Sequence, residues 1–307
     1  MEKKRHHHYV WRYYLRPWSS NNKIACLREG KFFEPNLMGI GQKRDFYKLK
    51  EVNSDELEFI KQLIIVRSRE HLQKLHSRFV RQYNYIFQFK KYIESKDIND
   101  KEIYDLLEAL IHNLEEDLHT DIELTAIKYI ESILREDIQF YDTDEGCMDF
   151  IYFLSVQYWR TERSKQSAIE AVGNITTINF ENVWNILSHI FAINMGWVLY
   201  AERKVFKMVL LKNETVKELI TGDQPVINAL ASLGLSKIPP TDIELYYPVS
   251  PKLAILISER EEYRSARLKL LNESEVISYN NMIVENSLSQ IYATSVRVLE
   301  EYKDFKK

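Results

Sequence analysis

Residues 101–118, which read KEIYDLLEALIHNLEEDL, decide the fold of this chain. Apolar residues recur here at a spacing of three and four, which is the period of a helix with one face against a core. The apolar stripe consists of Ile103, Leu106, Leu107, Leu110, Ile111, Leu114 and Leu118. The stretch therefore predicts a packed helix at the centre of the protein.

Helical patterns continue on both sides of this stretch. Ser54 precedes Glu56 and Glu58, and an acidic first turn suits the positive end of a helix dipole, so we expect a helix from Ser54 to about Glu94. Further helices are expected at 121–140, 147–171 and 180–203, with breaks at 142–146 and at Gly173-Asn174. Together they predict a helical middle over residues 54–204.

Both ends of the chain carry β-like patterns. Glu29-Gly30 separates the runs 23–29 and 31–34, and this spacing predicts an N-terminal hairpin. Runs of β-branched and aliphatic residues at 205–211, 244–247 and 253–258, separated by Pro239-Pro240 and Pro248, predict a small C-terminal sheet. Asn272 and Glu275 then mark the start of a last, long helix.

Composition agrees with a mainly α protein that has short β elements, an α+β fold. The chain has 307 residues with 45% hydrophobic and 28% charged side chains, and its 8 Gly and 7 Pro leave little material for many turns. No linker is visible, so we expect one composite domain over 1–307. Its parts are a His-rich arm and hairpin (1–50), the helical middle (54–204), and the sheet with its helix (205–307).

Charge and cysteine content limit the function classes. A formal net charge of -3 excludes non-specific coating of nucleic acid and leaves only a local patch for such contacts. Cys26 and Cys147 lie far apart, which fits ordinary thiols in a reducing compartment. Without a long apolar run, we expect no membrane contact and a cytoplasmic location.

The N-terminal arm is the first candidate for chemistry. In an extended segment His6 and His8 share one face and His7 takes the other. Two imidazoles on one face suit a metal or a phosphate, and Arg12 adds a planar charge. The alternative is a solvated basic arm.

Two further clusters lie deeper in the chain. Gln157, Arg160 and Thr161 fall at i, i+3 and i+4 of a helix and suit an anion or a base edge, unless the helix simply turns polar at its solvated end. Asp223 precedes Gln224 and Pro225 after a strand-like run, and suits a metal ligand or general base. The alternative for Asp223 is a turn in which its side chain bonds its own backbone.

A fourth pattern, Glu116-x-x-His119 with His112 nearby, resembles half of a di-iron site. A second such motif is lacking in the sequence, so we interpret His112 and His119 as structural. His71 and His76 are five residues apart, which misses the spacing of helical zinc pairs.

The order of these motifs resembles a bacterial family, Domain of Unknown Function 4238. The matching segments are His7 to Val10, Tyr14 to Arg16, Arg44 to Tyr47, Gln157 to Thr161, Asp223 to Pro225, Pro248 to Pro251, and the helix with Asn280, Asn281 and Asn286. Trp11 stands where the family has Pro, and Gln224 where Asn is common. The resemblance implies that His7, His8, Gln157, Arg160 and Asp223 meet in space. By analogy alone, it suggests a defence or toxin-type role.

These clusters predict a phosphodiester hydrolase of the nuclease type. His7, His8 and Asp223 are the expected catalytic residues. Arg12, Gln157, Arg160, Thr161 and Gln224 are the expected substrate-binding residues. A divalent metal is a candidate cofactor, with His6, His8 and Asp223 as candidate ligands.

A non-catalytic sensor or partner-binding protein is the alternative. It would recognise a nucleotide, a peptide or a phage component, and the 19 Tyr and 5 Trp offer stacking and anchor residues for such an interface. The sequence leaves the oligomeric state open.

Overall fold

A computed structural model describes residues 2–172, 178–231 and 242–305. It is 55% helical with 16% strand, which confirms a mainly α, α+β fold. The predicted breaks at Gly173-Asn174 and Pro239-Pro240 lie outside the described residues. Among the described helices, none has the length and apolar character needed to cross a membrane.

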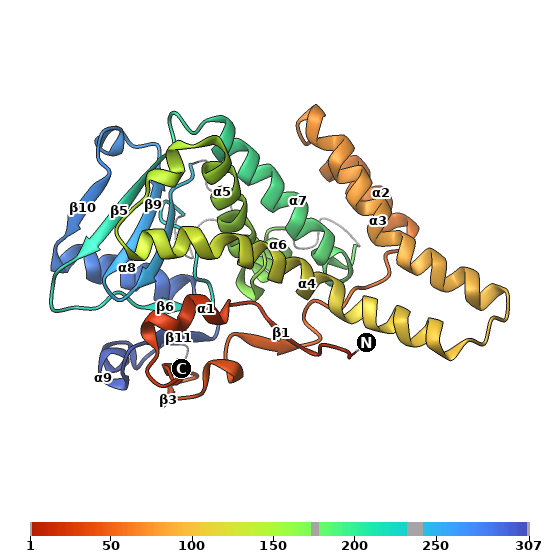
Figure 1. Ribbon diagram of the computed structural model, residues 1–307, viewed down its shortest axis with the longest axis horizontal. Coiled ribbons are helices and arrows are strands. Elements are labelled where there is room, and N and C mark those ends of the chain that lie inside the picture. The colour runs from red at the N-terminus through yellow and green to blue at the C-terminus, as the bar shows by residue number, and fades with distance from the viewer. Residues whose placement is uncertain (1, 173–177, 232–241, 306–307) are drawn as a thin grey trace.

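Helix α4 (Lys101–Leu134) crosses the middle of the molecule (Figure 1). Asp100 caps its start, because its side chain accepts from the backbone N–H groups of Glu102 and Ile103. The prediction of separate helices at 103–118 and 121–140 was wrong. No glycine or proline lies between His119 and Asp121, so the helix continues through them.

The helix predicted from Ser54 to Glu94 is interrupted. Helix α2 (Ser54–Phe59) starts with a capping box formed by Asn53 and Glu56, and a wide π-type turn (Ile60–Ile65) follows it. Helix α3 (Glu70–Ser95) then runs in a new direction. The Gln73 side chain donates to the carbonyl oxygens of Val66 (3.1 Å) and Ser68 (3.0 Å), which supplies partners for carbonyls freed at the bend.

The helix predicted at 147–171 is likewise two helices. Helix α5 (Asp144–Trp159) ends at Arg160, and helix α6 (Glu162–Val172) follows at once. Thr161 makes this corner, since its hydroxyl accepts from the Ser164 N–H at 3.2 Å. Helix α7 (Phe180–Ala201) confirms the helix predicted at 180–203 and packs along α5.

The C-terminal region forms a five-stranded sheet in the order β10-β5-β9-β8-β7. Its strands are β5 (Lys207–Asn213), β7 (Ile227–Asn228), β8 (Leu245–Ser250), β9 (Leu253–Ser258) and β10 (Leu268–Leu271). Strands β5, β8 and β9 confirm the three predicted strands, and β10 pairs in parallel with β5. Helix α8 (Glu273–Asn286) starts with the predicted capping box of Asn272 and Glu275.

The N-terminal hairpin is part of a second sheet. Strands β2 (Ala25–Arg28) and β3 (Lys31–Phe33) join β11 (Gln290–Ala293) and β6 (Thr221–Gly222) in the order β3-β2-β11-β6. Glu29 (φ 51°) and Gly30 (φ 71°) both have positive φ, as a type I′ turn requires. The two ends of the chain therefore share one sheet, whereas the sequence predicted them as separate parts.

The arm before the hairpin packs onto the helices. Strand β1 (His6–His8) pairs with β4 (Gln42–Arg44) and lies below α4 in Figure 1. Short helices α1 (Arg12–Leu15) and α9 (Val296–Leu299) complete the order, together with 3₁₀ turns at Arg16–Trp18, Leu37–Gly39, Gln139–Asp142, Glu261–Tyr263 and Glu300–Tyr302. Because His7 and Val10 are fully buried, the arm from His7 onward is part of the core, whereas residues 2–6 are exposed.

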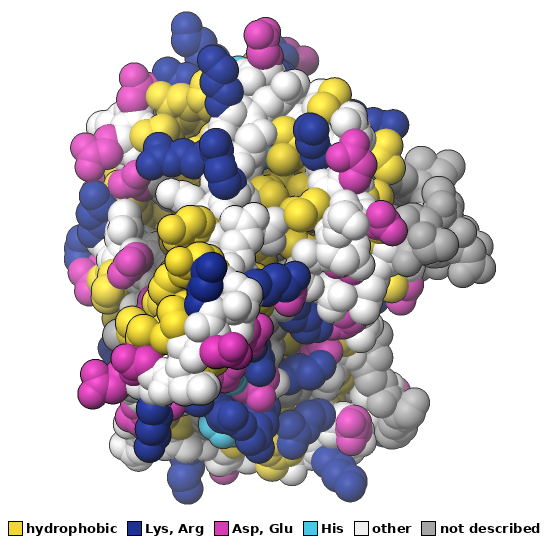
Figure 2. All heavy atoms as spheres, turned by 90° about the vertical axis from the view of Figure 1, so that its right-hand side faces the viewer, with side chains coloured by type: hydrophobic (Ala, Val, Ile, Leu, Met, Phe, Trp, Pro, Cys, Tyr) yellow, Lys and Arg dark blue, Asp and Glu magenta, His cyan; other side chains and the backbone are white. Residues whose placement is uncertain are grey.

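One large core joins the arm, α4, α5 and the five-stranded sheet. Tyr14 stacks on Tyr247 of β8, with ring centroids 4.8 Å apart, and Trp18 donates to the Leu219 carbonyl at 2.8 Å. The face seen in Figure 2 mixes Lys and Arg with Asp and Glu around bands of hydrophobic side chains. This mixture agrees with the small net charge of the chain.

Candidate functional site

Arg160 is the centre of a buried polar cluster. It lies at the corner between α5 and α6 with 3% of its surface exposed. Its Nε donates to the Tyr47 hydroxyl at 2.8 Å, one Nη donates to Glu123 and the other to the His8 carbonyl oxygen. One guanidinium thus joins the arm, the segment after β4, and α4.

His7 is held by the backbone through both ring nitrogens. The Tyr47 N–H donates to Nδ1 at 2.7 Å, so Nε2 carries the proton and donates to the Lys4 carbonyl at 2.9 Å. The ring also stacks on Tyr47. These contacts make His7 a positioning residue for Tyr47 and Arg160, and the catalytic role predicted for it stays a prediction.

His8 has a different environment from His7. Its N–H donates to Glu116 at 3.5 Å, and its Nε2 has no hydrogen-bond partner among the described residues. Burial, followed by the charge of Arg12, lowers the pKa of His8 to about 4, so the imidazole is neutral at physiological pH. Arg12 is exposed beside the cluster and contacts the Met38 sulfur.

Glu116 and Glu123 complete this cluster from α4. They are seven residues apart and so lie two turns apart on one face of the helix. Burial raises the pKa of Glu123 to about 7, although the guanidinium of Arg160 opposes the shift. We call His8, Arg12, Glu116, Glu123 and Arg160 the arm site.

Sequence reasoning did not assign Glu123 to a site, and it set Glu116 aside. The i, i+3, i+7 spacing of Glu116, His119 and Glu123 becomes a signal only on one continuous helix, whereas one predicted helix ended at 118 and the next began at 121.

Asp223 belongs to a second cluster. Its carboxylate accepts from the N–H groups of Leu288 (2.7 Å), Ser289 (2.7 Å) and Gln290 (3.0 Å), and from the Ser289 hydroxyl (2.8 Å). Asp223 therefore fixes the loop that enters β11, and these partners are distant in sequence, unlike those of the predicted Asx-type turn. No hydrogen bond in the described ranges joins Asp223 to His7 or His8.

Thr161 and Gln224 contact each other. The Thr161 hydroxyl donates to the Gln224 side-chain oxygen, and the Gln224 amide donates to the carbonyls of Tyr158 (3.2 Å) and Val226 (2.7 Å). This pair ties the α5–α6 corner to the segment after β6. Gln157 is buried one turn before Arg160, and its Nε2 has no partner in the described part of the chain.

A column of four aromatic rings leads from the arm to α7. His7 stacks on Tyr47 (5.7 Å between centroids), Tyr47 contacts His119 (4.5 Å), and His119 stacks on His189 (5.5 Å). Burial, and then the charge of Arg160, holds the pKa of His119 well below its ordinary range. Glu115 accepts from His189 Nε2 at 2.7 Å at the end of the column.

Glu115, His119 and His189 offer donor atoms that all lie within 4.8 Å of one another, and all three residues are buried. They are the one such group among the described residues. His112 has a different environment, since its Nδ1 lies 2.7 Å from the Glu108 carbonyl. His76 bonds Asn194 at 2.9 Å, and the His71 ring packs on Trp197.

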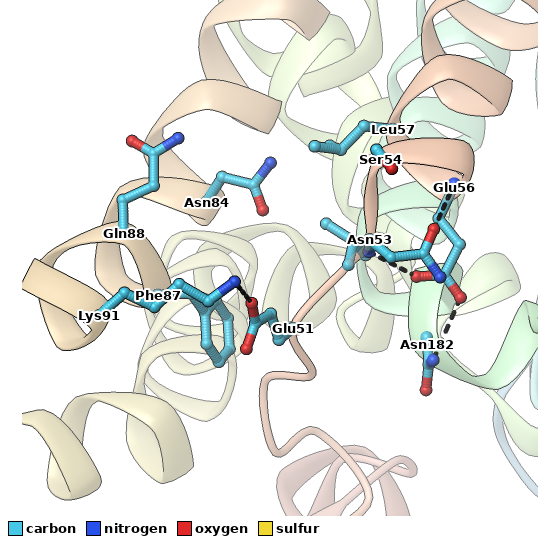
Figure 3. A pocket seen from close by; sticks show the side chains of 11 residues that line it. Glu51, Asn53, Ser54, Glu56, Leu57, Asn84, Phe87, Gln88, Lys91 and Asn182 are labelled. Carbon is cyan, nitrogen blue, oxygen red and sulfur yellow. Dashed lines mark hydrogen bonds and ion pairs between the residues drawn. The ribbon is translucent and has the colours of Figure 1, made fainter. Parts of the chain in front are cut away.

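A pocket on another part of the molecule is lined by none of these groups. It has a volume of about 590 Å³ and lies between the start of α2 and helix α3 (Figure 3). Asn84 and Gln88 line it from α3, while Asn53, Glu56 and Asn182 form a hydrogen-bonded group on its other side. A second pocket of about 340 Å³ lies beside Arg203 and Arg267, which pair with Asp144 and Asp142.

Residues 6–296 match the family model described as "Protein of unknown function (DUF4238)", and the chain belongs to this family. The match spans the arm, the Arg160 corner and the Asp223 loop. No curated protein and no solved structure matches the chain.

Proposed function

We propose that the protein is a hydrolase of phosphodiesters and that the arm site carries out the reaction. The observation that supports this most is the position of His8, whose free Nε2 lies in a cluster with two guanidinium groups and a buried carboxyl group. An acid, a base and fixed positive charge are the three elements that general acid–base cleavage of a phosphodiester needs.

Each residue then has a role set by its surroundings. Neutral His8 takes a proton from the attacking water as its oxygen bonds to phosphorus. Protonated Glu123 gives a proton to the leaving oxygen as the phosphorus–oxygen bond breaks. Exposed Arg12 holds the phosphate, and buried Arg160 orients Glu123 and the His8 backbone.

The other predicted site residues act as supports in this proposal. His7 fixes Tyr47, Asp223 fixes the loop before β11, and the Thr161–Gln224 pair fixes the corner that holds Arg160. Nucleic acid is the substrate class that we propose. Cleavage of nucleic acid in the cytoplasm would suit a bacterial defence or toxin-type effector.

Cleavage assays test the proposal. Purified wild type is incubated with RNA, tRNA, plasmid and single-stranded DNA, each with Mg²⁺, with Mn²⁺ and with a chelator. We expect cleavage that falls by about 100-fold or more in His8→Gln, because general acid–base catalysis contributes about 10²–10⁴ in rate.

His71→Gln is the matched control, since His71 is an exposed histidine of α3 outside the arm site. Equal activity of folded His8→Gln and wild type, or absence of cleavage of every substrate, would contradict the hydrolase.

The pocket of Figure 3 supports a second candidate, a sensor that binds a nucleotide without turnover. Its amide side chains match the edge of a base in hydrogen bonding, and Phe87 offers an aromatic ring. Calorimetric titration with nucleoside triphosphates tests it. Binding that weakens in Asn84→Ala, with no cleavage by wild type, would favour the sensor over the hydrolase.

A further inference from the structure

We propose that Glu115, His119 and His189 bind a divalent transition-metal ion, with Zn²⁺ as the best chemical fit. This site is separate from the arm site, and the inference does not depend on the proposed hydrolase. It differs from the metal ligands expected from the sequence, which were His6, His8 and Asp223.

The donor set supports zinc. Two imidazoles and one carboxylate are a ligand set found in zinc proteins, whereas Mg²⁺ and Ca²⁺ prefer oxygen donors alone. Glu115 and His119 are at i and i+4 of α4, so they project from one face of that helix, and His189 comes from α7. Elements from two parts of the chain thus converge on one point.

The distances also suit a single ion. Two ligands of a tetrahedral zinc ion are separated by about 3.4 Å, as zinc–ligand bonds of about 2.0–2.1 Å require. The Glu115 Oε2 lies 2.7 Å from His189 Nε2 and 3.9 Å from His119 Nε2, which bracket that value. Small side-chain rotations about the helical backbones would bring the three atoms around one ion.

The second ring nitrogen of His119 lacks a protein partner within the described chain. The residue is 3% exposed, and its Nδ1 has no hydrogen-bond partner among the residues described. Leaving a buried polar atom unpaired costs about 1–3 kcal/mol, so such atoms in native proteins call for an explanation. With Nε2 on the metal ion, Nδ1 would carry the ring proton, and a bound water that accepts from it would provide one.

The competing explanation is a hydrogen-bonded pair of Glu115 and His189 without any metal. That pair leaves His119 with a longer contact to the same carboxylate, because its Nε2 is 3.9 Å from Glu115 Oε2. A metal ion would engage all three residues and would join α4 to α7. Three protein ligands leave a fourth position for water or another small ligand.

The metal ligands predicted from the sequence, His6, His8 and Asp223, fit a metal site less well. All four hydrogen bonds to the Asp223 carboxylate come from the chain itself, and they occupy both of its oxygens. Among the described residues, neither His6 nor His8 belongs to a group of three donors close enough to share one ion.

Metal titration of the full chain tests the site. Protein stripped with a chelator is titrated with Zn²⁺ in a calorimeter, and separately with Co²⁺, whose visible bands report tetrahedral coordination. We expect one ion per chain. Glu115→Gln should bind more than about 100-fold more weakly, because even outer-shell changes cost about 10–100-fold in metal affinity. This variant keeps the shape of the side chain and its ability to bond His189.

The control variants separate the possible binding sites. His112→Gln removes a buried histidine of the same helix outside the site, and a His6→Gln/His8→Gln double variant removes the arm imidazoles. Binding that both controls keep and that Glu115→Gln and His189→Gln lose supports the proposal. Wild type that binds neither ion, or binding that only the double variant loses, would leave Glu115 and His189 as a hydrogen-bonded pair and overturn it.

Discussion

The guanidinium of Arg160 donates a hydrogen bond to the carbonyl oxygen of His8, although the two residues are 152 positions apart in the chain. The same side chain bonds Tyr47 and Glu123. Because all three partners come from different segments, this single residue fixes the arm against the helical middle. The contact explains how a short N-terminal strand becomes part of the core.

Replacing Arg160 by alanine should destabilise the protein strongly. Above pH 7, where Glu123 is ionised, the change leaves this carboxylate buried without its cation, and breaking a buried ion pair in this way costs about 3–5 kcal/mol. Urea unfolding followed by circular dichroism measures the loss. Arg163→Ala is the matched control, because Arg163 lies on α6 outside the arm site, and it should lose far less. An equal loss of unfolding free energy in both variants would contradict a specific stabilising role of Arg160.

Stability should fall as the pH falls from about 6.5 towards 4, in part through His8. The pKa of His8 is about 4 in the folded protein against an ordinary value of 6.5, so the unfolded chain binds more protons in this window. His8→Gln removes the titrating group. Its free energy of unfolding should therefore depend less steeply on pH between 6.5 and 4 than that of wild type, as urea titrations across this range will measure. Parallel curves for the two proteins would contradict the lowered pKa.

Asp223→Asn should loosen the loop that enters β11. The amide group offers a donor to neighbours that are themselves donors, the N–H groups of Leu288, Ser289 and Gln290. Leaving such groups unpaired costs about 1–3 kcal/mol. Hydrogen exchange should become faster at residues 288–290, while Asp121→Asn, an exposed change on α4, leaves them unaltered. Unchanged hydrogen-exchange protection at residues 288–290 in Asp223→Asn would contradict the structural role of this carboxylate.

Local periodicity predicted the helices and strands that have strong amphipathic or β-branched patterns. Helix α7 and strand β9 lie where the sequence placed them, and Asn272 caps a helix start as predicted. The π-type turn at Ile60–Ile65 carries the same apolar pattern as the helices beside it, so the pattern did not reveal it. Strand β11 was not predicted from the sequence. It is four residues long, and its partner strands β2 and β6 are distant in the sequence.

The site was harder to predict because it depends on contacts between distant segments. The motif order pointed to His8 and Arg160, which do meet. It could not show that backbone N–H groups, those of Tyr47 and Gln290 among them, bind His7 and Asp223, because residue types do not reveal where backbone groups lie. His189 was not predicted as a site residue because it is a lone histidine in an apolar helix. Its contact with Glu115, which is distant in sequence, is visible only in the structure.

The pH dependence of kcat/KM for phosphodiester cleavage tests the central claim most directly. His8 must be neutral and Glu123 protonated in the free enzyme, so the rate should follow a bell with limbs near pH 4 and pH 7. Glu123→Gln should abolish the fall above pH 7 together with most of the rate. A bell that disappears in this way would establish the acid–base pair of the arm site. A rate that keeps rising above pH 7, or wild type without turnover at any pH, would contradict it.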